Sequence, residues 1–149
     1  DETEHGVRFF VGEIADGYLQ KSGPTAGYSV VIFRGRHVGA PHEMTGDEHA
    51  AFWSEVGVVA ATIERVYRPV HLNFQILGNQ DPHVHVHIVP RHNPDPAPSM
   101  PLPAEAWIAS RRLDEIELGR QRAELRAAVS REHRSEVRAV DDMVEVRAR

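Results

Sequence analysis

The chain contains no cysteine, few aromatic residues and no long apolar run, and these shortages exclude several classes of protein. Without cysteine there is neither a disulfide framework of the kind that small secreted proteins use nor a cysteine-bound structural zinc. No run of about 18 apolar residues predicts a membrane helix, and the charged residues at the start do not resemble a signal peptide. We therefore expect a cytoplasmic protein with no membrane partner.

The charge balance also argues against a dedicated nucleic-acid-binding protein. Among the 149 residues, 17 are Lys or Arg and 22 are Asp or Glu, which gives a formal net charge of −5. Proteins that bind nucleic acids usually present a basic surface instead. With 41% hydrophobic residues, the chain suits one globular domain with a modest core and an appendage.

The most informative segment is HVHVHIVPR at residues 83–91. Side chains alternate between the two faces of a β-strand, so His83, His85 and His87 should share one face. The apolar residues between the histidines should enter the core on the other face. Imidazole titrates near neutral pH and its free base can attack an electrophile, so the pattern favours nucleophilic and acid/base chemistry.

Two other interpretations of the three histidines stay open. They could cover the solvent face of an amphipathic strand without a chemical role. They could also bind a metal, because histidine is a zinc ligand at about 2.0–2.1 Å. Alternate residues on a strand lie ~6.6 Å apart, however, so His83 and His87 could hardly share one ion. No HExxH pattern is present, and we expect no metal and no other cofactor.

The first half of the chain predicts a small α+β domain. We expect strands over residues 7–20 and 28–33, separated by the turn-rich segment KSGPTAG. Thr45 followed by Glu48 is a capping-box signature, and apolar residues recur at helical spacing until Pro69. These patterns predict one long helix that follows two strands.

Residues 70–77 alternate again between apolar and polar side chains, with Asn73 on the polar face. The tight loop GNQDP then leads into the histidine strand. If that connection is a hairpin, the two strands are antiparallel neighbours and Asn73 could lie beside the histidines.

The composition changes after residue 91. Residues 93–103 contain five prolines, which predicts an extended arm rather than a helix or an interior strand. We expect residues 104–149 to form a charged helical extension that packs on the domain or across a dimer. Its apolar stripe consists of Trp107, Ile108, Leu113, Ile116, Leu118 and Leu125. We therefore divide the chain into a catalytic domain, residues 1–103, and an extension, residues 104–149.

The segment HVHVHIVPR resembles the histidine-triad signature, in which His-Xaa-His-Xaa-His-Xaa-Xaa carries apolar residues at each Xaa. The run through Pro-Arg is similar to the dinucleoside-polyphosphate hydrolase branch of that family. LNFQILGNQDPH at residues 72–83 extends the resemblance, as AGYSVVIFRGRHV at 26–38 does more weakly. The resemblance covers residues 14–91. It implies a HIT-like α+β fold, with an antiparallel sheet of about five strands and a packed helix, in a homodimer.

The resemblance also implies roles for individual residues. His85 would attack the α-phosphorus of a nucleotide, His87 would hydrogen-bond the phosphate or the leaving group, and His83 would orient the triad. The residues expected to bind the substrate are Asn73, Gly78, Gln80, Gln20 and His37. Tyr28 stands where many relatives have histidine, and Gln20 is the nearest counterpart of an aspartate that holds ribose hydroxyls in one branch.

The activity implied is that of a metal-independent nucleotide hydrolase or nucleotidyl transferase with a nucleotidyl-histidine intermediate. Its partner would be a purine nucleotide or dinucleotide. Two substrate classes stay open, namely dinucleoside polyphosphates and nucleoside phosphoramidates or acyl nucleotides. A nucleotide-binding sensor without useful turnover and a metal-dependent enzyme that uses the histidine cluster are the alternatives. Chelation distinguishes the last, since removal of a catalytic ion abolishes activity.

Overall fold

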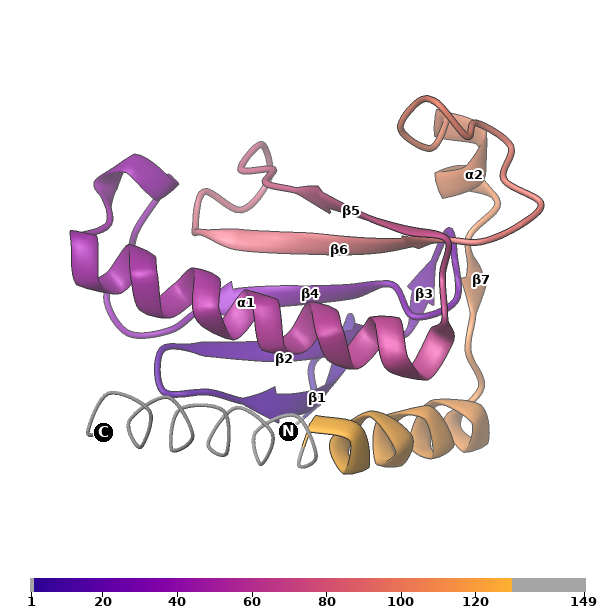
Figure 1. Ribbon diagram of the computed structural model, residues 1–149, viewed down its shortest axis with the longest axis horizontal. Helices are drawn as coiled ribbons and strands as arrows, with labels where there is room; N and C mark the ends of the chain where they lie inside the picture. The colour runs from indigo at the N-terminus through magenta and orange to yellow at the C-terminus, as the bar shows by residue number, and fades with distance from the viewer. Residues whose placement is uncertain (1, 130–149) are drawn as a thin grey trace, which may run out of the picture.

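A five-stranded antiparallel sheet forms the centre of the protein in the computed structural model, which describes residues 2–129 (Figure 1). The strands lie side by side in the order β1-β2-β4-β6-β5. Their bounds are Gly6–Val11 for β1, Ala15–Gln20 for β2, Ser29–Phe33 for β4, His71–Gln75 for β5 and His85–Arg91 for β6. The predicted α+β fold with about five antiparallel strands is confirmed.

Helices and two short strands complete the described part of the chain. They are β3 (Ser22–Gly23), the 3-10 helix η1 (Pro41–Glu43), α1 (Gly46–Tyr67), α2 (Ala104–Ile108) and β7 (Arg111–Arg112), followed by a helix over residues 115–129. β3 and β7 pair with each other. Within residues 2–129, no helix combines the length and the apolar character needed to cross a membrane.

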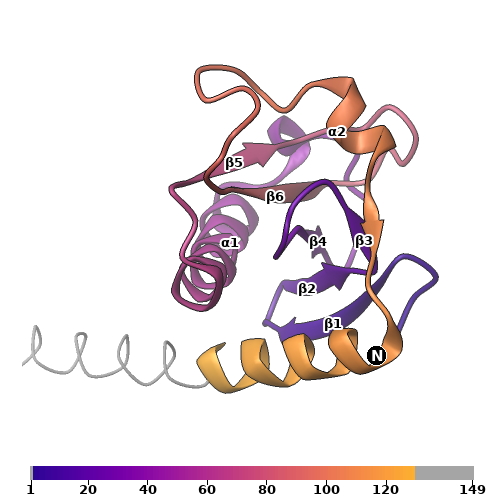
Figure 2. The ribbon, with the colours of Figure 1, turned by 90° about the vertical axis from the view of Figure 1, so that its right-hand side faces the viewer.

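The long helix α1 begins and ends as its sequence predicts. Thr45 accepts a hydrogen bond from the backbone N–H of Glu48, whose side chain accepts one from the N–H of Thr45, so the capping box is formed. The helix stops at Arg68, which adopts a left-handed conformation just before Pro69. Its buried face packs on the sheet through β2, β4 and β6. Figure 2 shows α1 on one side of the sheet, with β7 on the other.

The segment expected as one strand over residues 7–20 is instead the hairpin of β1 and β2. Glu55 of α1 explains the turn, because its carboxylate accepts hydrogen bonds from the backbone N–H groups of Glu13, Ile14 and Ala15 at 2.5–3.2 Å. Three N–H groups that would otherwise lack a partner in the turn are thereby satisfied. The prediction missed the turn because its stabilising partner lies 40 residues away along the chain.

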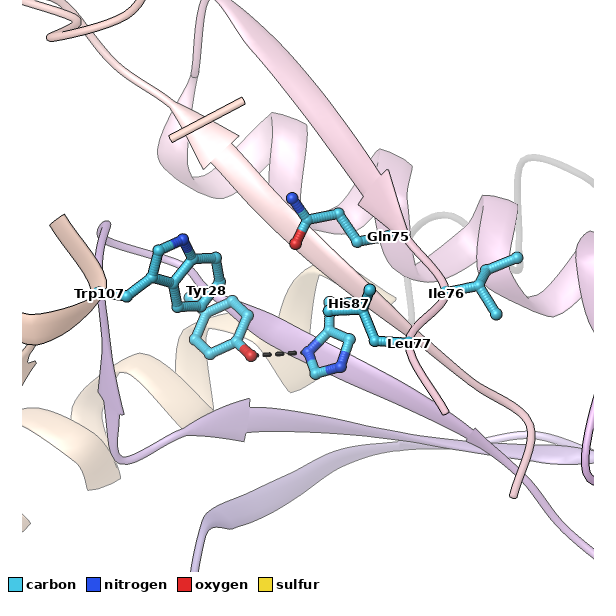
Figure 3. Close-up of a pocket in the computed structure, with 6 residues that line it drawn as sticks. All are labelled: Tyr28, Gln75, Ile76, Leu77, His87 and Trp107. Atoms are coloured by element: carbon cyan, nitrogen blue, oxygen red, sulfur yellow. Dashed lines mark hydrogen bonds between the residues drawn. The ribbon is translucent and has the colours of Figure 1, made fainter. Parts of the chain in front are cut away.

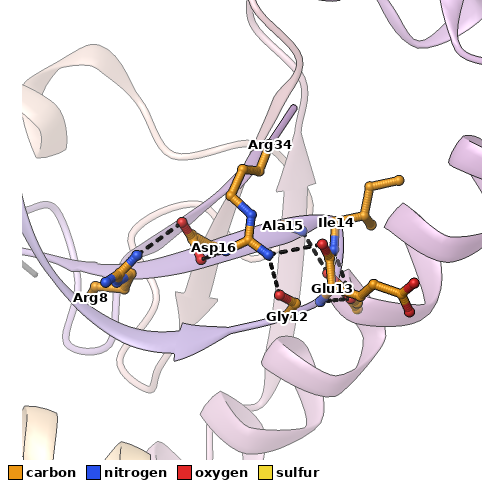
Figure 4. Close-up of polar contacts among 8 residues, drawn as sticks. Arg8, Gly12, Glu13, Ile14, Ala15, Asp16 and Arg34 are labelled. Carbon is orange, nitrogen blue, oxygen red and sulfur yellow. Dashed lines mark hydrogen bonds and ion pairs between the residues drawn. The ribbon is translucent and has the colours of Figure 1, made fainter. Parts of the chain in front are cut away.

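Asp16 anchors the same hairpin to β4. Its carboxylate lies 3.3 Å from the guanidinium of Arg8 and 3.1 Å from that of Arg34, which also donates to the carbonyl of Glu13 (Figure 4). The Asp16 side chain is only 11% exposed, and a buried carboxylate needs such partners.

The C-terminal helix over residues 115–129 runs alongside β1 (Figure 1, Figure 2). Leu118 and Leu125 are buried in the same core as the sheet, and Gln121 accepts a hydrogen bond from the hydroxyl of Tyr67 at 2.6 Å. This part of the extension therefore packs on its own domain. Ile108 and Ile116 were expected in the apolar stripe, but they are 84% and 86% exposed. The rest of the extension, after residue 129, lies outside the described residues.

Candidate active site

β6 begins at His85, so it carries two of the three histidines expected on one strand, and His83 lies just before it. Within and beside β6 the histidines and the apolar residues alternate between the two faces, as predicted. Val84, Val86 and Ile88 are at most 1% exposed and belong to the core that α1 covers. His85 and His87 lie on the other face, each partly exposed, and pair across the sheet with Ile32 and Val30 of β4. The apolar side thus fixes the orientation of the strand, and the polar side is left open to ligands.

The three triad histidines are connected by short contacts. The Nδ1 atom of His85 lies 2.7 Å from the backbone carbonyl oxygen of His83, and its Nε2 atom lies 3.0 Å from Nε2 of His87. The Nε2 atom of His83 lies 2.7 Å from the carbonyl oxygen of Phe33. A carbonyl oxygen only accepts, so His85 and His83 each donate through the nitrogen named. The ring of His85 is therefore oriented by a hydrogen bond to the backbone two residues earlier in the chain.

Tyr28 is the partner of the third histidine. Its hydroxyl lies 2.7 Å from Nδ1 of His87, and the two rings are nearly parallel with centroids 6.0 Å apart. Burial raises the pKa of Tyr28 to about 12. Burial, assisted by the charge of His85, lowers the pKa of His87 to about 4. From the sequence, Tyr28 was visible as a departure from the family, but nothing revealed its partner.

A pocket of about 480 Å³ opens beside His87 (Figure 3). Its walls are Tyr28, Gln75, Ile76, Leu77, His87 and Trp107. The rings of Trp107 and Tyr28 pack nearly perpendicular to each other, with the ring centroids 5.4 Å apart. The wall is apolar apart from His87, Gln75, the Tyr28 hydroxyl and the indole N–H of Trp107, and no acidic side chain lines it. Trp107 was expected in the apolar stripe of the extension, so its place in the pocket was not predicted.

The strand register places Gln75, rather than Asn73, next to the triad. β5 pairs Gln75 with His87 and Asn73 with Val89, so Asn73 lies two residues further along the same face. The Oδ1 atom of Asn73 accepts a hydrogen bond from the Nη1 atom of Arg91 at 2.6 Å. The sequence identified the correct face for both residues. The strand pairing, which decides whether Gln75 or Asn73 lies next to His87, could not be predicted from the sequence.

The other predicted substrate residues are more widely spread. Gly78 and Gln80 lie exposed in the loop between β5 and β6. Gln20 lines a separate pocket of about 250 Å³, and Tyr28 is the wall that this pocket shares with the pocket beside His87. The Nδ1 atoms of His37 and His83 lie 3.3 Å apart, at the end of the triad away from Tyr28.

Arg91 and His92, which could have contacted phosphate, have partners within the protein instead. Arg91 is 4% exposed, and its guanidinium forms an ion pair with Asp95 at 2.6 Å. It also donates to Asn73 and to the carbonyl oxygens of Met100 and Ala97. His92 donates to the carbonyl oxygen of Ala26 at 3.0 Å. Arg91 thus holds the proline-rich arm in place. Across residues 2–129, no group of three or more His, Cys, Asp or Glu is arranged to hold a metal ion.

Comparison with known proteins agrees with this geometry. The profile of the HIT domain matches residues 18–94, which is more than half of the chain. The chain belongs to the HIT family. The HIT domain thus runs from β2 to just beyond β6, so the triad, Tyr28 and Gln75 all lie within it. Trp107 lies outside it. Among curated proteins there is no significant match.

Solved structures share the HIT fold at low sequence identity. The histidine triad protein blr8122 of Bradyrhizobium japonicum is 19% identical, with a TM-score of 0.73 over 85% of this chain and 92% of that one. The hypothetical histidine triad nucleotide-binding protein ST2152 of Sulfolobus tokodaii is 19% identical, with a TM-score of 0.67 over 85% of each chain. A zinc-bound histidine triad family protein of Mycobacterium smegmatis is 20% identical, with a TM-score of 0.63 over 87% of this chain and 88% of that one.

Proposed function

We propose that this HIT protein is a nucleotide hydrolase or nucleotidyl transferase in which His85 attacks the α-phosphorus of a nucleotide. The observation that carries the proposal is the 2.7 Å contact between Nδ1 of His85 and the carbonyl oxygen of His83. It holds the proton of the uncharged ring on Nδ1 and leaves the lone pair on Nε2. Nε2 is therefore the nucleophilic atom. The nucleotide-binding description of the structurally similar Sulfolobus tokodaii protein supports a nucleotide as the substrate.

The reaction proceeds in two displacements at phosphorus. In the first, Nε2 of His85 bonds to phosphorus, and the bond from phosphorus to the leaving group breaks with its electron pair. The ring then carries a positive charge, which the carbonyl of His83 stabilises through the Nδ1–H. In the second, water or another acceptor attacks phosphorus, releases the uncharged imidazole and loses a proton to solvent. Two displacements replace one harder direct reaction.

The two neighbouring pockets suggest how a purine nucleotide is held. A ligand that extends from His87 towards Gln20 passes Tyr28, because Tyr28 lines both pockets. We assign the polar contact beside His87 to Gln75 and a contact with the nucleoside to Gln20. Gly78, Gln80 and His37 remain proposed substrate contacts, at the loop before β6 and beside His83.

We further propose that the protein is a homodimer and that β5 contributes to the interface. β5 is the last strand of the sheet, so its outer edge has no strand partner among residues 2–129. Phe74 on this strand is 48% exposed and Val70 just before it is 60% exposed. Sedimentation of the native chain and of Phe74→Glu tests this, since a charge at the contact should yield monomers.

The decisive experiment measures turnover of diadenosine tri- and tetraphosphate and of an adenosine phosphoramidate, in EDTA, by the native chain and by His85→Ala. We expect release of nucleoside monophosphate that persists in EDTA and falls at least about 10³-fold in the variant. His5→Ala is the matched control, because His5 is an exposed histidine away from the triad. Mass spectrometry after brief mixing should detect a nucleotidyl group on His85.

Each alternative predicts a different result in the same experiment. Nucleotide binding by the native chain without any product would indicate a sensor. Activity that is lost in EDTA and restored by zinc would indicate a metal-dependent enzyme, a possibility raised by the zinc-bound relative from Mycobacterium smegmatis. Turnover that survives His85→Ala would exclude His85 as the nucleophile.

A further inference from the structure

Tyr28, His87, His85 and the carbonyl of His83 form one continuous hydrogen-bonded chain, and when both rings are uncharged only one placement of the protons satisfies it. His85 donates from Nδ1 to the carbonyl, so Nε2 of its uncharged ring accepts. His87, at 3.0 Å, must then donate from Nε2. The Nδ1 atom of uncharged His87 therefore accepts, and the hydroxyl of Tyr28, at 2.7 Å, is the donor.

The position of the Tyr28 hydroxyl is set by contacts on several sides of its ring. The ring lies nearly parallel to that of His87, end to end with it through the hydroxyl, and packs almost perpendicular to the ring of Trp107. Gly27 precedes Tyr28 with a φ of +84°, and a Cβ at Gly27 would lie 2.6 Å from the ring of Tyr67. Only glycine fits this turn. The packing around the ring and the turn at Gly27 thus keep the Tyr28 hydroxyl directed at His87.

The surroundings of His87 favour its uncharged form. The titratable groups that face it are His85 on its own strand and Tyr28 from the start of β4. Gln75, Ile76, Leu77 and Trp107 complete the pocket wall, and none of them can balance a positive charge. Burial accordingly lowers the pKa of His87 to about 4 and raises that of Tyr28 to about 12. Near pH 7 both groups stay uncharged.

An uncharged histidine with a fixed Nε2–H stabilises some leaving groups much better than others. It can donate a hydrogen bond to an oxygen that departs as a stable anion, and no proton has to be transferred. An amine must take up a proton as the phosphorus–nitrogen bond breaks. To supply that proton, His87 would have to become an anion or draw the proton of Tyr28, whose pKa is about 12.

We propose that Tyr28 holds His87 as an uncharged hydrogen-bond donor, and that the site therefore selects nucleotides whose leaving group departs as an oxygen anion, a polyphosphate or a carboxylate, over phosphoramidates. This inference rests on the proposed attack by His85. As Nε2 of His85 bonds to phosphorus, the phosphorus–oxygen bond breaks and its electron pair leaves with the oxygen. The Nε2–H of His87 stabilises that oxygen without losing its proton. Tyr28 is a positioning residue, since it acts through His87.

The test compares kcat/KM for diadenosine tetraphosphate with that for an adenosine 5′-alkylphosphoramidate, which has the same transferred nucleotide and an amine leaving group. The native chain should turn over the tetraphosphate at least about 100-fold faster. Tyr28→Phe should lower kcat for the tetraphosphate about 10-fold with KM unchanged, because the ring remains and only the hydroxyl is lost. Tyr18→Phe is the matched control, a tyrosine hydroxyl removed from β2, and should change neither constant.

The variant Tyr28→His distinguishes a role of Tyr28 in substrate selectivity from a purely structural role. An imidazole at this position can pass a proton to Nδ1 of His87, so it should restore part of the kcat that Tyr28→Phe loses. It should also lower the ratio of kcat/KM for the tetraphosphate to that for the phosphoramidate about 10-fold below the native ratio. Equal rates on both substrates in the native chain would overturn the proposal. So would an unchanged preference in a well-folded, active Tyr28→His.

Nitrogen-15 NMR of the His87 ring tests the hydrogen bond independently of activity. In His85→Ala, Tyr28 is the remaining partner of the ring, and we expect Nδ1 without a proton and Nε2 with one. Adding Tyr28→Phe should produce a mixture of the two tautomers. A mixture in His85→Ala itself would overturn the role of Tyr28. If the native chain turned over neither substrate while His87 kept one tautomer, the proposed function would fail and the hydrogen bond would stand.

Discussion

The two ends of β6 carry polar groups of opposite character. At one end, His85 and His87 are partly exposed and contact each other through their Nε2 atoms, and His87 lines an open pocket. At the other end, Arg91 is charged and 4% exposed, and both of its terminal nitrogens bond to the protein itself. The same strand thus bears a candidate site for chemistry and a structural clamp. They differ in exposure, because solvent reaches the two histidines whereas Arg91 is buried.

Replacing one residue at each end should give the largest and most clearly opposed effects. Arg91→Leu should lower the Tm by at least about 5 °C, because the arm loses its clamp and Asp95 loses its counter-ion. His85→Ala should shift the Tm by less than about 2 °C while activity disappears. Calorimetry and the turnover assay measure both. A stable Arg91→Leu with lost nucleotide affinity would mean that Arg91 serves the substrate after all.

Two amide side chains of β5, Gln75 and Asn73, allow the same comparison between a substrate contact and a structural contact. Gln75→Ala should lower kcat/KM about 10-fold and leave the Tm nearly unchanged, since Gln75 lines the pocket beside His87. Asn73→Ala should mainly lower the Tm, because Arg91 loses an acceptor. Steady-state kinetics and thermal unfolding on both variants decide the matter. The reverse pattern would restore Asn73 as the substrate contact.

The two ends should also respond to acid in different pH ranges. The pKa of His87 is lowered from 6.5 to about 4, so the unfolded chain takes up a proton in that range before the folded one does. Stability should therefore fall as the pH drops from 6.5 to 4, and His87→Gln should flatten this slope. Hydrogen bonds from Arg91 hold the pKa of Asp95 below its usual 3.8. The stability that Asp95 contributes should persist down to about pH 4 and decrease only below that pH. This decrease should be absent in Asp95→Asn. Urea unfolding across this range measures both.

The smallest effect is expected at the start of the triad. His37→Ala should reduce kcat only about twofold, because His83 keeps its shorter hydrogen bond to the carbonyl of Phe33. The turnover assay on diadenosine tetraphosphate checks this. A loss of 100-fold or more would contradict this expectation and give His37 a part in the chemical step.

Sequence patterns predicted the features that depend on local periodicity. Alternation along residues 83–88 identified the histidine face and the buried valines, and the capping box at Thr45 identified the start of α1. Both follow from neighbours a few residues apart in the chain. The family could also be recognised, because its signature lies within one short, continuous segment of the chain.

The features that the sequence did not reveal all depend on contacts between distant segments. Gln75 faces His87 because of the pairing between β5 and β6, which are separated by a loop of nine residues. Tyr28 meets His87 across 59 positions, and Trp107 approaches from beyond the HIT domain. Turn residues and apolar periodicity do not fix the register across a loop of this length, and they do not specify contacts between segments so far apart in the chain.

The position of Trp107 also has a consequence for the order in which the protein is made. The strands of the five-stranded sheet, the triad and Tyr28 are all encoded before residue 92, whereas Trp107 follows the proline-rich arm. A ribosome therefore releases the histidines, with their hydrogen-bonding partners, before it releases one wall of their pocket. During synthesis, the nascent chain passes through a stage in which the triad histidines have left the ribosome but the aromatic side chain that packs on Tyr28 has not.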